Sequence, residues 1–142
     1  MIDTPGADDP RAAAGSPGTA GPLAAVDAVV ATARRLTAAR LRAPLSGPVA
    51  TRADAARLLA RVLATSGQGI EAADEPEPPR WRTLPELPDL GLGDQLAVLA
   101  HDFRRAVTTA ASALVWTPDG RAPLADVVRD VAATADEVGR ML

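Results

Sequence analysis

The sequence predicts an all-α fold, a four-helix bundle made of two antiparallel hairpins joined by a long proline-rich crossover loop. Four stretches repeat apolar residues every three or four positions, which is the period of an amphipathic helix. Alanine supplies much of the 47% hydrophobic content, whereas only one Phe and two Trp are aromatic, a balance that favours helices over strands. Clusters of Pro and Gly separate the stretches. Because large side chains are scarce, we expect a thin core between closely approaching helices.

The chain divides into a tail and one domain. Residues 1–21 contain three prolines and four glycines and almost no large apolar side chain. Such a segment buries too little surface to offset the entropy of ordering it, so a disordered N-terminal tail is predicted. Residues 22–142 then form a single helical-bundle domain, and 142 residues leave no room to expect a second one.

The first two helices are predicted over residues 22–42 and 51–65. Pro22 suits a first helical turn, and Pro44 ends the helix because a residue that precedes proline is pushed out of the α region. Thr51 followed three residues later by Asp54 resembles a capping box before the next apolar stripe. Ser66-Gly67 is a C-terminal stop signal for that helix.

Residues 67–92 hold five prolines and three glycines, which excludes a long helix and predicts a long loop. Its leucines and Trp81 indicate that the second half lies along the bundle. The third helix is expected over 93–116, before the Thr117-Pro118-Asp119-Gly120 turn, and the fourth over 124–142. The short connections predict hairpins between the first and second helices and between the third and fourth.

Charge is unevenly distributed although the total is only −3. Residues 22–70 contain seven arginines and two acidic residues, whereas residues 71–89 contain six acidic residues and two arginines. The basic hairpin could attract nucleic acid or an acidic partner, but a solvated arginine-rich face is the simpler interpretation. A third hypothesis is that the acidic stretch 71–77 folds back over the hairpin and neutralises it.

Function is predicted first as a non-enzymatic protein–protein interaction or accessory module, whose partner is another protein or a second copy of the chain in a homodimer. Apolar residues beside the alanine-rich stripes exceed what one small bundle buries, which favours association. Tryptophan and arginine are common at binding hot spots. The candidate partner-binding residues are Arg34, Arg35, Arg57, Arg61 and Trp81. For Trp81 the first interpretation is a packing lid over a bundle opening, and a partner anchor is the alternative.

A small-molecule-binding or enzymatic bundle is the second hypothesis, with Asp94, His101 and Trp81 around the crossover loop as ligand-binding residues. His101 and Asp102 cannot form a catalytic dyad, because consecutive residues on a helix diverge by about 100°. The chain has a single His and no Cys, so no catalytic residue, metal site or cofactor is predicted.

The stretch from Trp81 to Asp102 contains prolines, the run Gly91-Leu92-Gly93-Asp94-Gln95-Leu96 and then Ala100-His101. It resembles the loop-to-helix passage of DinB-like and maleylpyruvate isomerase-like bundles. The resemblance implies a helical bundle. Members of those families typically bind metal through three histidines, and only His101 could match, so the resemblance does not imply their metal-dependent chemistry here.

Nucleic-acid binding through the arginine-rich hairpin is a third alternative and is not expected. The run Thr51 to Leu59 resembles the first helix of some helix-turn-helix domains, but no short turn and second helix follow it. Gly91-Leu92-Gly93 lacks the third Gly or Lys of a phosphate-binding loop. The apolar runs are too short to span a bilayer, and the first residues lack the pattern of a secretory signal, so the cytoplasm is the expected location.

Overall fold

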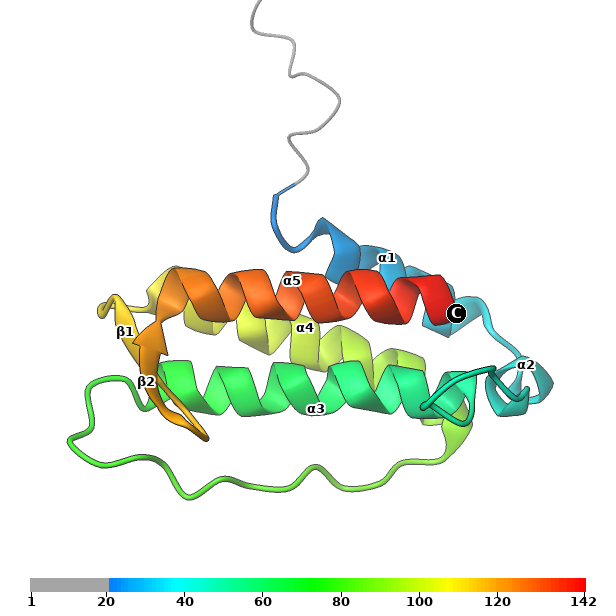
Figure 1. The fold of residues 1–142 in the computed structure, drawn as a ribbon, viewed down its shortest axis with the longest axis horizontal. Helices are drawn as coiled ribbons and strands as arrows, with labels where there is room; N and C mark the ends of the chain where they lie inside the picture. Colours follow the sequence, from blue (N-terminus) through cyan, green and yellow to red (C-terminus); the bar gives the residue numbers. More distant parts are fainter. Residues whose placement is uncertain (1–20) are drawn as a thin grey trace, which may run out of the picture.

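The computed structural model describes residues 21–142, so the prediction of a disordered tail over 1–21 falls almost wholly outside the described residues. The described part is mostly helical, with one two-stranded sheet (Figure 1). Its elements are α1 (Ala24–Arg35), α2 (Ala38–Arg42), α3 (Arg52–Glu71), the 3₁₀ turn η2 (Asp89–Gly91), α4 (Leu92–Thr109), β1 (Leu114–Thr117), β2 (Gly120–Pro123) and α5 (Leu124–Met141).

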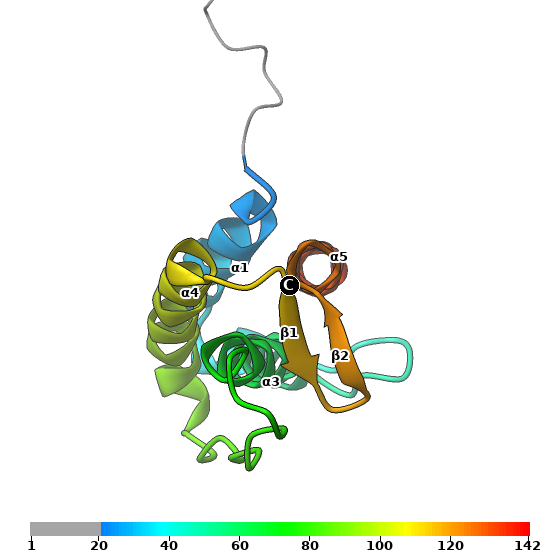
Figure 2. The same ribbon diagram turned by 90° about the vertical axis from the view of Figure 1, so that its left-hand side faces the viewer.

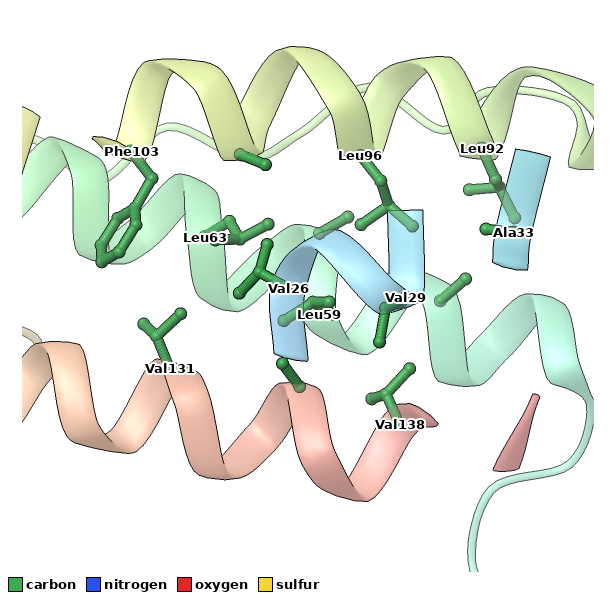
Figure 3. Close-up of a cluster of buried hydrophobic side chains, with 14 of the residues drawn as sticks. Val26, Val29, Ala33, Leu59, Leu63, Leu92, Leu96, Phe103, Val131 and Val138 are labelled. Carbon is green, nitrogen blue, oxygen red and sulfur yellow. The ribbon is translucent and has the colours of Figure 1, made fainter. Parts of the chain in front are cut away.

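Helices α1, α3, α4 and α5 enclose one apolar core. Side chains from all four converge in it, among them Val26, Leu63, Phe103 and Val131 (Figure 3). Helix α3 contributes several fully buried alanines, including Ala55 and Ala56, which lets the neighbouring backbones come close. Small side chains thus make up a large part of the core.

The predicted pairing of consecutive helices into hairpins is wrong. Helix α1 packs against α4 and α5, and α3 also packs against α4 and α5, so α1 and α3 occupy opposite corners in the end view (Figure 2). The physical reason is the length of the connections. The chain between α1 and α3 includes α2, and the chain between α4 and α5 includes the β-hairpin, so each connection is long enough to cross the end of the molecule diagonally.

The first predicted helix, 22–42, is two helices. Leu36 is extended, with φ −75° and ψ 134°, and Thr37 caps α2 by accepting a hydrogen bond from the Arg40 amide through its hydroxyl (3.3 Å). A threonine that caps a new helix competes with continuation of the old one. The apolar period continues through Thr37, so by itself it predicts one continuous helix.

The second predicted helix, 51–65, does begin at a Thr51 cap, whose hydroxyl accepts from the Asp54 amide at 3.1 Å. However, it continues through Ser66-Gly67 to Glu71. Gly69 and Ile70 are buried against the β-hairpin, and this burial outweighs the cost of about 1 kcal/mol for a glycine inside a helix.

The third predicted helix, 93–116, ends early at Thr109. The residues after it form a β-hairpin, so the prediction of an all-α fold is only partly correct. Residues Leu114–Thr117 pair antiparallel with Gly120–Pro123, so the predicted interhelical turn is the turn of a β-hairpin. Val115 is fully buried, which explains why this β-branched and aromatic stretch packs as a strand. The fourth predicted helix, 124–142, corresponds to α5.

The β-hairpin closes one end of the helices by backbone contact. A Cβ atom on Gly69 of α3 would lie 1.9 Å from the Trp116 carbonyl oxygen, so only glycine fits there. The Trp116 indole donates to the Glu75 carbonyl (3.1 Å), and the Arg121 guanidinium lies 4.2 Å from the centre of the Trp116 ring. Arg121 also donates to the carbonyls of Ala73 and Glu75. Hairpin and helix end form one tightly joined unit.

Candidate functional site

The candidate site lies where the long connection between α3 and α4 passes over these two helices. The colours of Figure 1 show that α3 and α4 run in the same direction, so the chain must return the length of the molecule between them. Residues 72–88 make this return without regular helix or strand. The prolines within this segment have no amide hydrogen to donate and favour extended backbone.

Two polar clamps hold the returning segment. Upstream, the Gln68 side chain of α3 accepts from the Arg82 amide (2.8 Å) and donates to the Arg82 carbonyl (3.2 Å). Downstream, Asp89 accepts from Arg57 of α3 (2.7 Å) and from Arg42 of α2 (3.3 Å). We call residues 82–89, between and including the clamped positions, the strap.

Asp89 is the electrostatic centre of the downstream clamp. The hydrogen bond from Arg57 lowers the pKa of the Asp89 carboxyl, burial opposes this shift, and the hydrogen bond from Arg42 lowers the pKa further. The carboxylate is therefore ionised at neutral pH and fastens α2, α3 and the strap together. Arg57 uses the same Nη2 to donate to the Leu87 carbonyl (3.1 Å), which ties a second strap residue to α3.

Two hollows lie beneath the strap. The first, of about 380 Å³, is bounded by α3, the strap and the start of α4; the second, of about 300 Å³, lies further along the same two helices. Thr83 and Leu84 line both hollows. The first is lined by Arg57, Ala60, Arg61, Thr83, Leu84, Pro85, Glu86, Leu87 and Gln95. Apolar surface and two guanidinium groups thus meet in one open groove.

Arg57 and Arg61, both predicted for partner binding, are one turn apart on α3 and line this first hollow. They are not equivalent. Arg57 is engaged by Asp89 and Leu87, and its Nε is buried with no hydrogen-bond partner in the described part of the chain. Arg61 is exposed and forms no ion pair within residues 21–142.

The other predicted partner-binding residues lie elsewhere. Arg34 donates to Asp94 at the contact between α1 and α4 (3.0 Å), and Arg35 is exposed on α1. Because α1 and α3 are at opposite corners, their arginines do not share one face. Trp81 packs beside Gly69: a Cβ added to Gly69 would lie 3.4 Å from the Trp81 ring. This position suits a lid over the end of α3.

The continuous basic patch that nucleic-acid binding requires is therefore absent from the described residues. Arg34, Arg42 and Arg57 are paired with aspartates. The hypothesis that the acidic stretch 71–77 neutralises the basic residues is also wrong for residues 21–142, since Asp89 and Asp94 do so instead. The carbonyls of Ala73 and Glu75 instead accept hydrogen bonds from Arg121 of the β-hairpin.

The structure does not bring Asp94, His101 and Trp81 together. Asp94 is in the first turn of α4, while Trp81 lies beside Gly69 near the end of α3; because these helices are parallel, the two residues are at opposite ends. His101 is exposed on α4. Within residues 21–142, no three His, Asp or Glu side chains are grouped so that they could hold a metal ion.

No family model, curated protein or solved structure matches this chain in the comparisons made. The short resemblance to DinB-like bundles thus gains no support from relatives. In the part of the chain that the structure describes, no helix has the length and apolar content needed to cross a bilayer.

Sequence reasoning missed the residues that build the groove. The local signals place Gln68 in a loop and Asp89 in an acidic segment, whereas the structure places Gln68 on α3 and Asp89 between two arginines. Leu84 was expected to lie along the helices, but nothing in the sequence indicated that it would separate two hollows.

Proposed function

We propose that this chain is a protein–protein interaction module that binds a partner segment in the first hollow, between α3 and the strap. The scaffold is a four-helix bundle with an added β-hairpin. The carrying observation is that Arg61, a cation with no ion pair in the described chain, stands beside the apolar lining made by Ala60, Leu84 and Leu87.

This juxtaposition suits a partner side chain that is apolar and has a carboxylate close to it. Apolar contact supplies the affinity, and a planar guanidinium binds carboxylate oxygens in a directed geometry. Arginine is enriched at interface hot spots for this reason. The groove is open and about 380 Å³ in volume, which fits one or two side chains of a docked segment.

The test is site-specific photo-crosslinking in the source cell. A photo-reactive amino acid replaces Leu87, which is 37% exposed at the rim of the hollow, and in a control chain it replaces the exposed Ala133 on α5. We expect one protein to be crosslinked in stoichiometric amount from position 87 and not from position 133. Mass spectrometry then tells another protein from a second copy of this chain.

Charge reversal on the same background sharpens the test. Arg61→Glu should reduce the crosslinked fraction at least about tenfold, because a lost charge-assisted hydrogen bond and the new repulsion exceed 1.4 kcal/mol. Arg35→Glu reverses another exposed cation, on α1, and should leave the crosslinked fraction unchanged. Equal crosslinking from both positions, or equal loss with both reversals, would contradict the proposal.

A further inference from the structure

The two hollows are the ends of one furrow between α3 and α4 that the strap interrupts. Early turns of α3 and Gln95 of α4 line the first hollow, and later turns of α3 with Leu99 and Phe103 of α4 line the second. Leu84 is the half-buried strap side chain that belongs to both. Leu84 is thus the apolar strap side chain that separates the two hollows, and the second hollow also has Glu71 and Asp102 in its lining.

Few contacts keep the strap in place. Between the clamps at Arg82 and Asp89, every residue except Leu84 is exposed. Apart from the clamps, the strap backbone is held by the bond from Arg57 to Leu87, by a long one from Gln95 to the Pro85 carbonyl (3.4 Å) and by a local bond from the Gly91 amide to the Pro88 carbonyl (2.8 Å). A segment with little buried apolar surface and few hydrogen bonds opens at low cost compared with the helices beneath it.

The strap also shows which chemistry the furrow accepts. Its sequence repeats a triplet, Leu84-Pro85-Glu86 and then Leu87-Pro88-Asp89. Pro88 has the dihedral angles of a polyproline II helix, φ −54° and ψ 152°, a conformation in which residues three apart share one face. The segment that occupies the furrow thus presents Leu84 to the helices, with the Glu86 carboxylate two residues further along the chain.

We infer that the upstream part of the strap is a built-in competitor for the binding site. The partner is an extended, acidic, leucine-bearing segment of another protein, and its leucine displaces Leu84 from the furrow while the downstream clamp keeps Leu87 beside the first hollow. This inference rests on the proposed function and adds the chemistry of the partner and a regulation of its binding. While the strap is closed, affinity is reduced by the fraction of molecules in which it is open.

The test uses a fluorescein-labelled synthetic peptide with the sequence of residues 82–90, followed by fluorescence anisotropy against the full chain. The opened variant is Gln68→Ala/Leu84→Ala, which removes the upstream clamp and the plug without changing any charge. The matched control is Leu114→Ala/Thr134→Ala, which removes a half-exposed leucine and a side-chain hydrogen bond away from the strap. Circular dichroism verifies that each variant is folded, and Leu84→Ala alone serves if the double variant unfolds.

We expect the opened variant to bind the peptide at least about tenfold more tightly than the wild type and the control do, since a strap closed in nine molecules of ten imposes that factor. A peptide with Ala in place of its first Leu should lose this gain. Equal affinity for all three proteins, or no binding to any of them, would overturn the inference.

The outcomes separate this inference from the function on which it rests. If a partner is captured at position 87 but opening the strap leaves peptide affinity unchanged, the strap is not a competitor and the interaction module stands. If opening the strap tightens peptide binding but no partner is captured in the cell, the proposed function fails and the competition remains.

Discussion

The β-hairpin end and the strap both cover α3, but they are attached to it in different ways. At the hairpin end, Gly69 allows the Trp116 backbone to touch the helix so closely that even a Cβ has no room. Under the strap, two polar clamps span hollows of about 380 and 300 Å³. Close backbone packing gives stability and no room for a ligand, whereas a clamped segment over empty space gives a site that can open.

The largest expected effect is at the closed end. Gly69→Ala places a Cβ 1.9 Å from a backbone oxygen that cannot move without the whole hairpin, so we expect a loss of about 3 kcal/mol in the free energy of unfolding. Urea unfolding followed by circular dichroism measures it. Gly67→Ala is the matched control in the same helix, has open space around it, and should stabilise by roughly 0.5–1 kcal/mol. Similar values for the two substitutions would contradict the close approach.

The next effect tests the role of Trp81. Its ring lies beside Gly69 and is half-buried, so Trp81→Ala should cost about 2 kcal/mol of stability, less than for a fully buried tryptophan. Crosslinking of the partner from position 87 should persist, because Trp81 does not line the first hollow. Loss of the partner with unchanged stability would instead make Trp81 a binding anchor, as in the other interpretation of the sequence.

On the strap side, Asp89→Asn should lower stability by only about 1 kcal/mol, since its ion pairs are partly exposed. The pKa of Asp89 is lowered in the folded state, so its contribution is present above the ordinary aspartate pKa of about 3.9 and is lost as the pH falls through the folded-state value. Urea midpoints measured from pH 7 to pH 2 should therefore converge for wild type and Asp89→Asn at the acid end. Asp94→Asn, whose ion pair with Arg34 is more exposed, should be almost neutral. A constant gap between wild type and Asp89→Asn at all pH values would contradict the clamp.

The smallest expected effect on stability is that of Arg61→Glu, within about 0.5 kcal/mol, because the side chain is exposed and forms no ion pair in residues 21–142. Thermal unfolding checks this value. The same substitution is expected to reduce partner capture at least about tenfold. Unchanged stability with reduced capture would show that Arg61 acts in binding and not in folding. A large loss of stability would mean that Arg61 is structural.

Sequence reasoning located the helices better than their limits or neighbours. Thr51 and Asp54 do cap α3, and the stripe from Leu124 onward does form α5. The predicted helix ends at Ser66-Gly67 and at Trp116 are wrong. Ile70 of α3 and Val115 of β1 are buried where α3 packs against β1, and this burial outweighs the local stop signals. Of the candidate site, the sequence indicates Arg57 and Arg61, which do line the first hollow, whereas Arg34 and Trp81 lie elsewhere.

The sequence by itself determined the helical periodicity, the scarcity of large side chains and the proline-rich segment that cannot be helix, because these follow from local propensity and spacing. Only the tertiary structure decided that α1 and α3 lie at opposite corners, that Asp89 joins Arg42 to Arg57, and that Leu84 divides a furrow. These features depend on contacts between residues far apart in the chain, for which no local pattern carries information.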